Sequence, residues 1–339
     1  MKHALILAPF AEASAKRLGE KMQVTHENWL EAGRIYDPEE LGRRLAAEQV
    51  HYLVVEADFV FEETFEAAKG LELVGICRNA LNHVDIDAAT KHGVLVVNVP
   101  GRNSLAVAEH TIGLMLGLAR RIPQADAFIK GGAWEDPVGG YRNFRGTELA
   151  GKIAGIVGLG AIGRLVAKRL AAMEMRLLAF DPYLDARLAS SLGIQLTTLD
   201  DLLSRSDYVL VHAPANEATM GLIGEGQLKR MKASAYLINP SAPGVVDEAA
   251  LIAALQAGRI AGAALDVFEG HPLQENSPLR QMSNVVLTPH IGGATEETVE
   301  RQSEMIAEDI LLVAQGRQPK RLVNPAVLKE HALRAKLKV

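Results

Sequence analysis

Short apolar runs alternate with helical patterns along almost the whole chain. This alternation is typical of βαβ units, in which crossover helices join parallel strands. In the N-terminal part, the runs that read as strands are Ala4–Ala8, Tyr52–Glu56, Leu73–Cys77 and Val94–Val97, and the helical stretches between them are Ala11–Lys21, Pro38–Gln49, Phe61–Lys69 and Ile86–His92. The pattern predicts an α/β fold built on a parallel sheet.

A second series of the same kind follows. Its expected strands are Ile153–Val157, Arg176–Phe180, Tyr208–His212, Tyr236–Ile238, Ile260–Leu265 and Val285–Leu287, and Asp247–Ala257 forms a helix among them. With 339 residues, the chain is too long for one small hydrophobic core. We therefore expect two α/β domains.

Two breaks in the pattern mark the domain boundaries. The first, at Val99–Asn103, precedes a long helix, and the second, at Thr288–Thr295, precedes a final amphipathic helix at about Glu297–Gln315. We expect this last helix to return to the first domain. The domains are then residues 1–102 with 296–330, and residues 103–295. We expect 329–339 to form a loose tail.

Composition excludes several classes of function. The formal charge is −5, so a basic field for DNA or RNA is absent. No apolar run approaches the roughly 18–20 residues of a membrane span. The single cysteine, Cys77, excludes an intrachain disulfide and a cysteine-rich zinc site, and the ten histidines are too scattered to indicate a metal. We expect a cytoplasmic protein with no nucleic-acid or membrane partner.

A glycine motif directly follows the first strand of the second series. Gly158, Gly160 and Gly163 have the spacing G-x-G-x-x-G, and a helix begins within the motif. The first glycine permits a tight turn, the second lets the backbone approach a pyrophosphate, and the third allows close packing of helix and strand. The free N–H groups of a helix N-terminus also favour phosphate. This context predicts a dinucleotide site.

Asp181 ends the next strand, 18 residues after Gly163, near the spacing of a ribose-binding acid. A carboxylate accepts hydrogen bonds from both ribose hydroxyls and repels a 2′-phosphate, and neither Pro182 nor Tyr183 is a cation. We therefore expect NAD rather than NADP. The alternative is that Asp181 only caps the turn through Pro182.

Beyond these two features, the chain resembles a known family. The residues that carry the resemblance are Gly158–Gly163, Asp181, His212-Ala213-Pro214, Asn239 with Asp247, Ala264-Leu265-Asp266-Val267-Phe268 and Thr288-Pro289-His290-Ile291-Gly292-Gly293. In this order they are similar to the D-isomer-specific 2-hydroxyacid dehydrogenases, in particular to phosphoglycerate dehydrogenase-like members. The resemblance implies two Rossmann-like parallel-sheet domains, one flavodoxin-like and one doubly wound, with a cleft between them. It also implies that residues 1–102 with 296–330 bind the substrate, that residues 103–295 bind NAD, and that the helix after Asn103 forms a homodimer.

The resemblance assigns roles residue by residue. It makes His290 the general acid/base that exchanges a proton with the substrate oxygen, a task that suits an imidazole. It gives Asp266 the nicotinamide carboxamide. It has Ala161 and Ile162 present backbone to the pyrophosphate, and lines the rest of the cofactor site with His212, Ala213, Pro214, Pro240, Ser241, Ala242 and Gly292. Its substrate-binding positions are the backbone of Asn79 and Ala80 and the side chain of Asn103, with Arg78 nearby.

Two positions depart from the family pattern. Ala242 stands where relatives have an arginine that binds the substrate carboxylate, and alanine makes no charge-assisted hydrogen bond. His271 stands where relatives have a glutamate that pairs with the catalytic histidine. Since a neutral imidazole does not favour a neighbouring imidazolium as a carboxylate does, His271 changes the proton chemistry of His290.

These departures leave three readings open. The favoured one is an NAD-dependent oxidoreductase for a small, anionic 2-hydroxy or 2-oxo acid or a related compound, in which another cation such as Arg78 or Arg102 replaces the missing arginine. The second is an NAD-binding sensor without turnover. The third is an enzyme that uses NAD for a transient oxidation, with a lyase or epimerase outcome.

Overall fold

The computed structural model describes residues 1–329 and 333–337. The chain divides into two compact units, Met1–Arg102 with Thr295–Val339 (unit 1) and Asn103–Ala294 (unit 2). These crossing points differ from those expected from the sequence by no more than one residue. Among the described residues, no helix combines the length and the apolar character that a membrane crossing requires.

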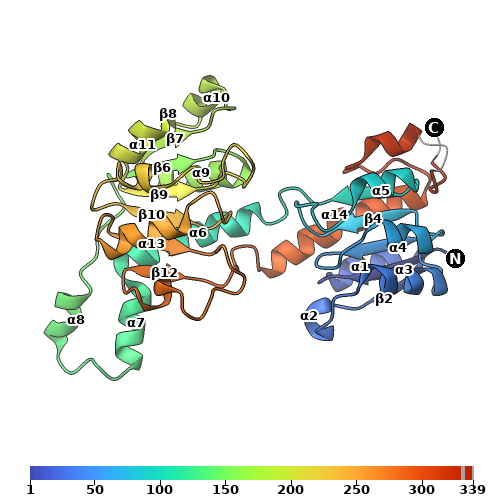
Figure 1. The fold of residues 1–339 in the computed structure, drawn as a ribbon, viewed down its shortest axis with the longest axis horizontal. Helices are drawn as coiled ribbons and strands as arrows, with labels where there is room; N and C mark the ends of the chain where they lie inside the picture. The colour runs from blue at the N-terminus through green and yellow to red at the C-terminus, as the bar shows by residue number, and fades with distance from the viewer. Residues whose placement is uncertain (330–332, 338–339) are drawn as a thin grey trace. The chain divides into compact units, whose positions relative to one another are not determined.

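Unit 1 is built on a five-stranded parallel sheet with the order β2-β1-β3-β4-β5 (Figure 1). The strands are β1 (His3–Leu7), β2 (Gln23–His26), β3 (Tyr52–Val55), β4 (Leu73–Ile76) and β5 (Leu95–Asn98). This is the flavodoxin-like order. β2 was not predicted, because it is a partly exposed edge strand with a single aliphatic residue, Val24, and therefore has no apolar run.

Helices cover both faces of this sheet. Alternate residues of β1 divide between the faces, since Ala4 and Ile6 belong to one apolar core and Leu5 and Leu7 to the other. One face packs against α1 (Glu12–Gly19) and α14 (Glu296–Ala314), and the other against α3 (Pro38–Ala47), α4 (Glu62–Ala67) and α5 (Ile86–Lys91); a short α2 (Trp29–Ala32) follows β2. The final helix, α14, therefore belongs to unit 1.

The expected loose tail is wrong for Lys329, which ends a 3₁₀ helix, and for residues 333–337. After η2 (Pro325–Lys329), the Arg334 guanidinium donates to the carbonyl oxygens of Ala68 (2.7 Å) and Phe65 (3.2 Å), and Ala335 is buried. These carbonyls lie at the end of α4, where the helix leaves acceptors unpaired, so a cation is stabilised there. The remainder of the predicted tail, 330–332 and 338–339, lies outside the described residues.

Unit 2 is built on a seven-stranded parallel sheet with the order β12-β11-β10-β9-β6-β7-β8. Its strands are β6 (Ile153–Val157), β7 (Arg176–Phe180), β8 (Gln195–Leu196), β9 (Tyr208–Val211), β10 (Tyr236–Asn239), β11 (Gly262–Leu265) and β12 (Val285–Leu287). From β6 the strands are added outward through β7 to β8, and from β9 they are added on the other side of β6, so the topological switch point lies between β6 and β9. Doubly wound folds bind ligands at this point. Two parallel-sheet units confirm the expected fold class; the two-residue β8 was too short to be predicted.

The helices of unit 2 also form two layers. One layer contains α6 (Ser104–Arg120), α9 (Ala161–Ala172) and α10 (Ala186–Ser191), and the other contains α11 (Leu199–Arg205), α12 (Glu225–Leu228) and α13 (Glu248–Gln256). A 3₁₀ turn, η1 (Pro278–Gln281), precedes β12. Two further helices, α7 (Ile122–Lys130) and α8 (Pro137–Asn143), have no buried residue and extend away from the sheet (Figure 1).

Candidate functional site: one edge of the unit 2 sheet

The carboxyl ends of parallel strands lie at the same edge of a sheet, so residues that directly follow the strands of unit 2 gather there. The expected cofactor and catalytic residues follow six of these strands: Gly158–Gly163 follow β6, Asp181 follows β7, His212–Pro214 follow β9, Pro240–Ala242 follow β10, Asp266 follows β11, and His290 with Gly292 follows β12. His271 lies in the segment between β11 and β12. The fold thus brings residues from more than 130 positions of sequence, 158 to 292, to one edge.

The three glycines of the loop after β6 meet different surroundings. Gly158 has a φ of +90°, and a Cβ there would lie 2.7 Å from the backbone nitrogen of Ala213. A Cβ on Gly163 would lie 2.3 Å from the carbonyl oxygen of Gly158, so the helix packs directly on the turn. A Cβ on Gly160 would meet no atom of the described residues within 4 Å. Two glycines are required by the fold, and the third borders open space.

The N-terminus of α9 faces this open space. Its first helical hydrogen bond runs from the Arg164 N–H to the Gly160 carbonyl, so the N–H groups of Ala161 and Ile162 precede the ladder, and no described side chain caps them. The Arg164 side chain donates through Nε to the carbonyl oxygen of Leu159 (2.9 Å), which adds a cation beside the loop. Free N–H groups, a helix dipole and a cation together suit a pyrophosphate. Arg164 was not among the residues predicted for the site.

Asp181 is held by two backbone groups. Oδ2 accepts the N–H of Leu159 (2.8 Å), and Oδ1 accepts the N–H of Tyr183 (3.0 Å). The second bond is the turn cap that the sequence analysis weighed as an alternative, and the first ties the carboxylate to the glycine loop. Since each carboxylate oxygen has a second lone pair, both contacts leave room for the hydroxyls of an adenosine ribose. The residues at this end of the edge fit a dinucleotide.

The ends of β9 and β10 are joined through side chains. Nδ1 of His212 lies 3.2 Å from Oγ of Ser241, and the Asn239 amide donates to the carbonyl oxygen of Ala242 (3.0 Å). Burial lowers the pKa of His212 to about 3, so this imidazole is neutral. Its Nε2 is buried and has no hydrogen-bond partner among the described residues, which leaves a polar atom for a ligand at this edge.

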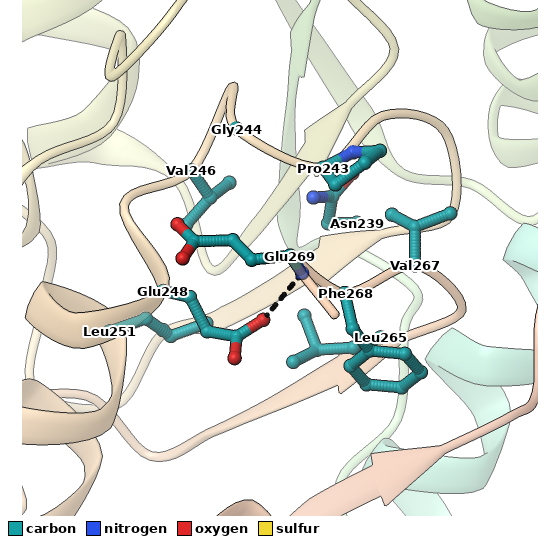
Figure 2. A pocket seen from close by; sticks show the side chains of 10 residues that line it. All are labelled: Asn239, Pro243, Gly244, Val246, Glu248, Leu251, Leu265, Val267, Phe268 and Glu269. Atoms are coloured by element: carbon teal, nitrogen blue, oxygen red, sulfur yellow. Dashed lines mark hydrogen bonds between the residues drawn. The ribbon is translucent and has the colours of Figure 1, made fainter. Parts of the chain in front are cut away.

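Ala242 itself is buried, with 8% of its surface exposed, and packs in the apolar core. A shallow pocket lies beside its loop (Figure 2). Its lining includes the carboxylates of Glu248 and Glu269, and the Glu248 side chain accepts the N–H of Glu269 at 3.1 Å. None of the ten described residues that line it is basic, so the pocket does not suit an anionic substrate.

His271 and His290 form a pair. Nε2 of His271 lies 3.0 Å from Nδ1 of His290, and the two rings meet edge to face with centroids 5.1 Å apart. Both side chains are exposed. His290 has a φ of +56°, in the left-handed region that non-glycine residues seldom adopt. The predicted partnership of the two histidines is thus present as a direct contact.

Asp266 anchors the loop that carries His290. Its fully buried carboxylate accepts hydrogen bonds from the Thr288 hydroxyl (2.6 Å) and from the N–H groups of Ile291 (2.9 Å) and Gly292 (2.7 Å). Burial raises the pKa of Asp266, but the hydrogen bonds from His110, Thr288 and the two N–H groups outweigh this and lower it below its ordinary value. His110 lies in no sequence motif that marks it, and Thr288 begins the motif of His290 without an assigned role of its own.

The expected substrate-binding residues divide between the two units. In unit 1, Arg78, Asn79 and Ala80 follow β4 and are exposed, and the Arg78 side chain makes no hydrogen bond or ion pair with the described residues. Arg102 is engaged instead, since it pairs with Glu56 (3.0 Å). In unit 2, Nδ2 of Asn103 would lie 2.9 Å from a Cβ on residue 293, so Asn103 packs against the loop of His290.

His83 lies in the same segment of unit 1 as Arg78. It is 4% exposed, and neither ring nitrogen has a hydrogen-bond partner among the described residues. Burial, and then the positive charge of Arg78, lower the pKa of His83 to about 4. The imidazole is therefore neutral near pH 7.

Comparison with known proteins identifies the family. The model of the D-isomer specific 2-hydroxyacid dehydrogenase, NAD binding domain, matches residues 112–292. A D-3-phosphoglycerate dehydrogenase of Archaeoglobus fulgidus is 45% identical over 262 residues, which are 77% of this chain and 49% of that protein. The chain thus spans about half the length of this relative.

A shorter relative and a solved structure match more of their own length. A glyoxylate reductase of Thermofilum pendens is 43% identical over 277 residues, 81% of each chain. The crystal structure of the TT0316 protein from Thermus thermophilus superimposes with a TM-score of 0.83 at 32% identity, over 95% of this chain and 100% of that one. The chain belongs to the D-isomer specific 2-hydroxyacid dehydrogenases, and its unit 2 contains the segment that matches the NAD-binding domain of that family.

Proposed function

We propose that the chain moves a hydride between NAD and the CH–OH carbon of a small, anionic 2-hydroxy or 2-oxo acid or a related compound, with His290 as the general acid/base. The observation that carries the proposal is the 3.0 Å contact between His271 and His290 at the sheet edge where the glycine loop also lies. An imidazole exchanges protons near neutral pH, and a second imidazole in contact with it holds its ring orientation.

The cofactor, when bound, supplies the hydride acceptor or donor. The residues of this chain bind and orient it: the N–H groups of Ala161 and Ile162, with Gly160, receive the pyrophosphate, and Asp181 receives the adenosine ribose. The remaining positions proposed to line it are His212, Ala213, Pro214, Pro240, Ser241, Ala242, Asp266 and Gly292. Because the hydrogen bonds of Asp266 run to the loop of His290, its contribution to the carboxamide is secondary to its role in that loop.

Proton transfer at His290 depends on which nitrogen of the pair carries the shared proton. When Nδ1 of His290 donates to Nε2 of His271, the Nε2 atom of a neutral His290 carries a lone pair that accepts the proton of a substrate hydroxyl. When the pair holds one more proton and is positively charged, Nε2 of His290 carries a proton; as this proton passes to a substrate carbonyl oxygen, the pair returns to its neutral form. A carboxylate in place of His271 would only accept, so Nδ1 of His290 would always be the donor of the shared hydrogen bond.

For the substrate carboxylate, we propose Arg78 together with the backbone at Asn79 and Ala80, and the side chain of Asn103. The Arg78 guanidinium has no ion-pair partner in the described part of the chain, whereas the charge of Arg102 is engaged by Glu56. Arginine donates two parallel hydrogen bonds to a carboxylate, so Arg78 supplies the chemistry that Ala242 lacks.

We also propose a homodimer formed through α6 and the helices that follow it. On α7, α8 and the segment between them, large apolar side chains are exposed: Ile122, Ile129, Trp134, Val138 and Tyr141. Contiguous exposed apolar side chains mark association surfaces. Light scattering after size-exclusion chromatography is expected to give twice the chain mass of 36.5 kDa, and Trp134→Glu is expected to give the monomer.

The proposed activity is tested with a panel of 2-oxo acids, 2-hydroxy acids, sugar acids and neutral carbonyls, followed by NADH absorbance. Glyoxylate and 3-phosphoglycerate belong in the panel because relatives are named for reactions of these acids. Turnover confined to carboxylate-bearing compounds, and lost in Arg78→Ala, supports the proposal. No turnover on any compound, with NADH bound, would contradict it and favour an NAD-binding sensor.

A further inference from the structure

The loop of His290 is fixed at both ends by one carboxylate. Thr288, two residues before His290, donates its hydroxyl to Oδ1 of Asp266, and Ile291 and Gly292, directly after it, donate their backbone N–H groups to Oδ1 and Oδ2. These bonds hold His290 in its left-handed conformation, which non-glycine residues seldom adopt. The position of the imidazole therefore depends on the orientation of this carboxylate.

Gly292 allows the close approach. A Cβ at this position would lie 2.9 Å from Oδ2 of Asp266 and 3.4 Å from Cδ2 of His110. The loop, the carboxylate and the His110 ring of α6 are therefore packed against one another without space for a side chain at residue 292. A displacement of the His110 ring would therefore displace the loop of His290 as well.

The hydrogen-bond chemistry fixes the tautomer of His110. Its Nε2 lies 3.1 Å from Oγ1 of Thr288 and 3.4 Å from Oδ1 of Asp266. The single hydroxyl proton of Thr288 is used in the 2.6 Å bond to Asp266, so Oγ1 has only lone pairs to offer His110. The carboxylate also only accepts. Nε2 of His110 must therefore carry a proton and donate it.

We propose that His110 is a positioning residue for His290: its Nε2–H holds Thr288 and Asp266 in the arrangement that orients the loop of the acid/base. This inference rests on the proposed role of His290, but the geometry on which it depends lies wholly within unit 2. His110 is 178 residues from Thr288 in sequence. Its side chain is 21% exposed, so most of the ring is buried where it contacts the loop of His290.

Two substitutions separate the hydrogen bond from packing. His110→Gln keeps an N–H donor at a similar reach, and His110→Leu fills a similar space without a donor. Because a small misplacement of a catalytic group costs up to about 100-fold in rate, we expect kcat of His110→Leu to fall about 10- to 100-fold. We expect KM and NADH affinity to stay within about two-fold, and His110→Gln to retain most of the rate. Equal losses in both variants, or no loss in His110→Leu, would overturn the proposal.

A second measurement does not require turnover. Amide hydrogen exchange of Ile291 and Gly292, measured by NMR on the full chain, is expected to accelerate in His110→Leu and in Thr288→Val, and to stay slow in His110→Gln. Unchanged exchange in both His110→Leu and Thr288→Val would overturn the positioning role. A wild type that is inactive on the whole panel would defeat the proposed function, while the exchange data would still decide the role of His110.

Discussion

Nε2 of His271 lies 3.0 Å from Nδ1 of His290, so two imidazoles share the hydrogen bond at the proposed centre of proton transfer. An imidazole pair differs from an imidazole–carboxylate pair in two ways: it has no fixed negative charge, and either partner can be the donor. Both differences have measurable consequences.

His271→Glu is expected to move the pH–rate profile. A carboxylate at this position stabilises the imidazolium form of its neighbour, and so typically raises the pKa of that imidazole by about 1–3. The reductive rate, which needs a protonated acid, would then persist to higher pH, and the oxidative rate, which needs a free base, would begin at higher pH. His271→Gln is the neutral control. Profiles of His271→Glu and His271→Gln that coincide would remove His271 from the proton chemistry.

The cofactor preference depends on Asp181. The wild type is expected to bind NADH at least about 10-fold more tightly than NADPH, because a carboxylate beside a 2′-phosphate costs several kcal/mol. Asp181→Ser keeps a side-chain acceptor for the Tyr183 N–H and should reduce this preference. Fluorescence titration with both cofactors measures it. Equal affinity of the wild type for NADH and NADPH would show that Asp181 only caps its turn.

Alanine substitutions at two glycines of the same loop are expected to affect different properties, the stability of the protein in one case and its NADH affinity in the other. In Gly163→Ala, the new Cβ meets the Gly158 carbonyl at 2.3 Å, so the melting temperature should fall. In Gly160→Ala, the Cβ enters open space at an ordinary φ of −70°, so the protein should melt as the wild type does but bind NADH at least about 10-fold more weakly. Unimpaired NADH binding by Gly160→Ala would place the pyrophosphate elsewhere.

The stability of unit 1 should fall in acid because of His83. Its pKa is lowered to about 4 in the folded protein, whereas an unfolded histidine titrates near 6.5. Between these values the unfolded chain binds a proton that the folded one does not, so the unfolding free energy decreases as the pH falls, by up to about 3 kcal/mol at pH 4.

This slope can be measured in unit 1 alone, because Trp29 lies in unit 1 and Trp134 in unit 2. In a Trp134→Phe background, tryptophan fluorescence during urea unfolding reports unit 1. We expect His83→Leu to flatten the pH dependence between about pH 6.5 and 4. An unchanged slope would mean that His83 is protonated in the folded state.

The parts of the fold and site that sequence could predict are those encoded locally. The strand, glycine loop and helix at 153–172 form one continuous pattern, and Asp181 follows at the spacing that the next strand dictates. The edge strand Gln23–His26 was missed because its exposed residues are polar. Contacts such as His110 with Thr288 join residues 178 positions apart, and only the packing of α6 against the sheet brings them together.

The central claim, that His290 is the acid/base of an NAD-dependent oxidoreductase, is tested most directly by His290→Asn on the best substrate of the panel. Loss of general acid–base catalysis typically costs about 10²- to 10⁴-fold, so we predict a fall of kcat in that range with NADH affinity unchanged. Turnover at the wild-type rate in His290→Asn would contradict the account.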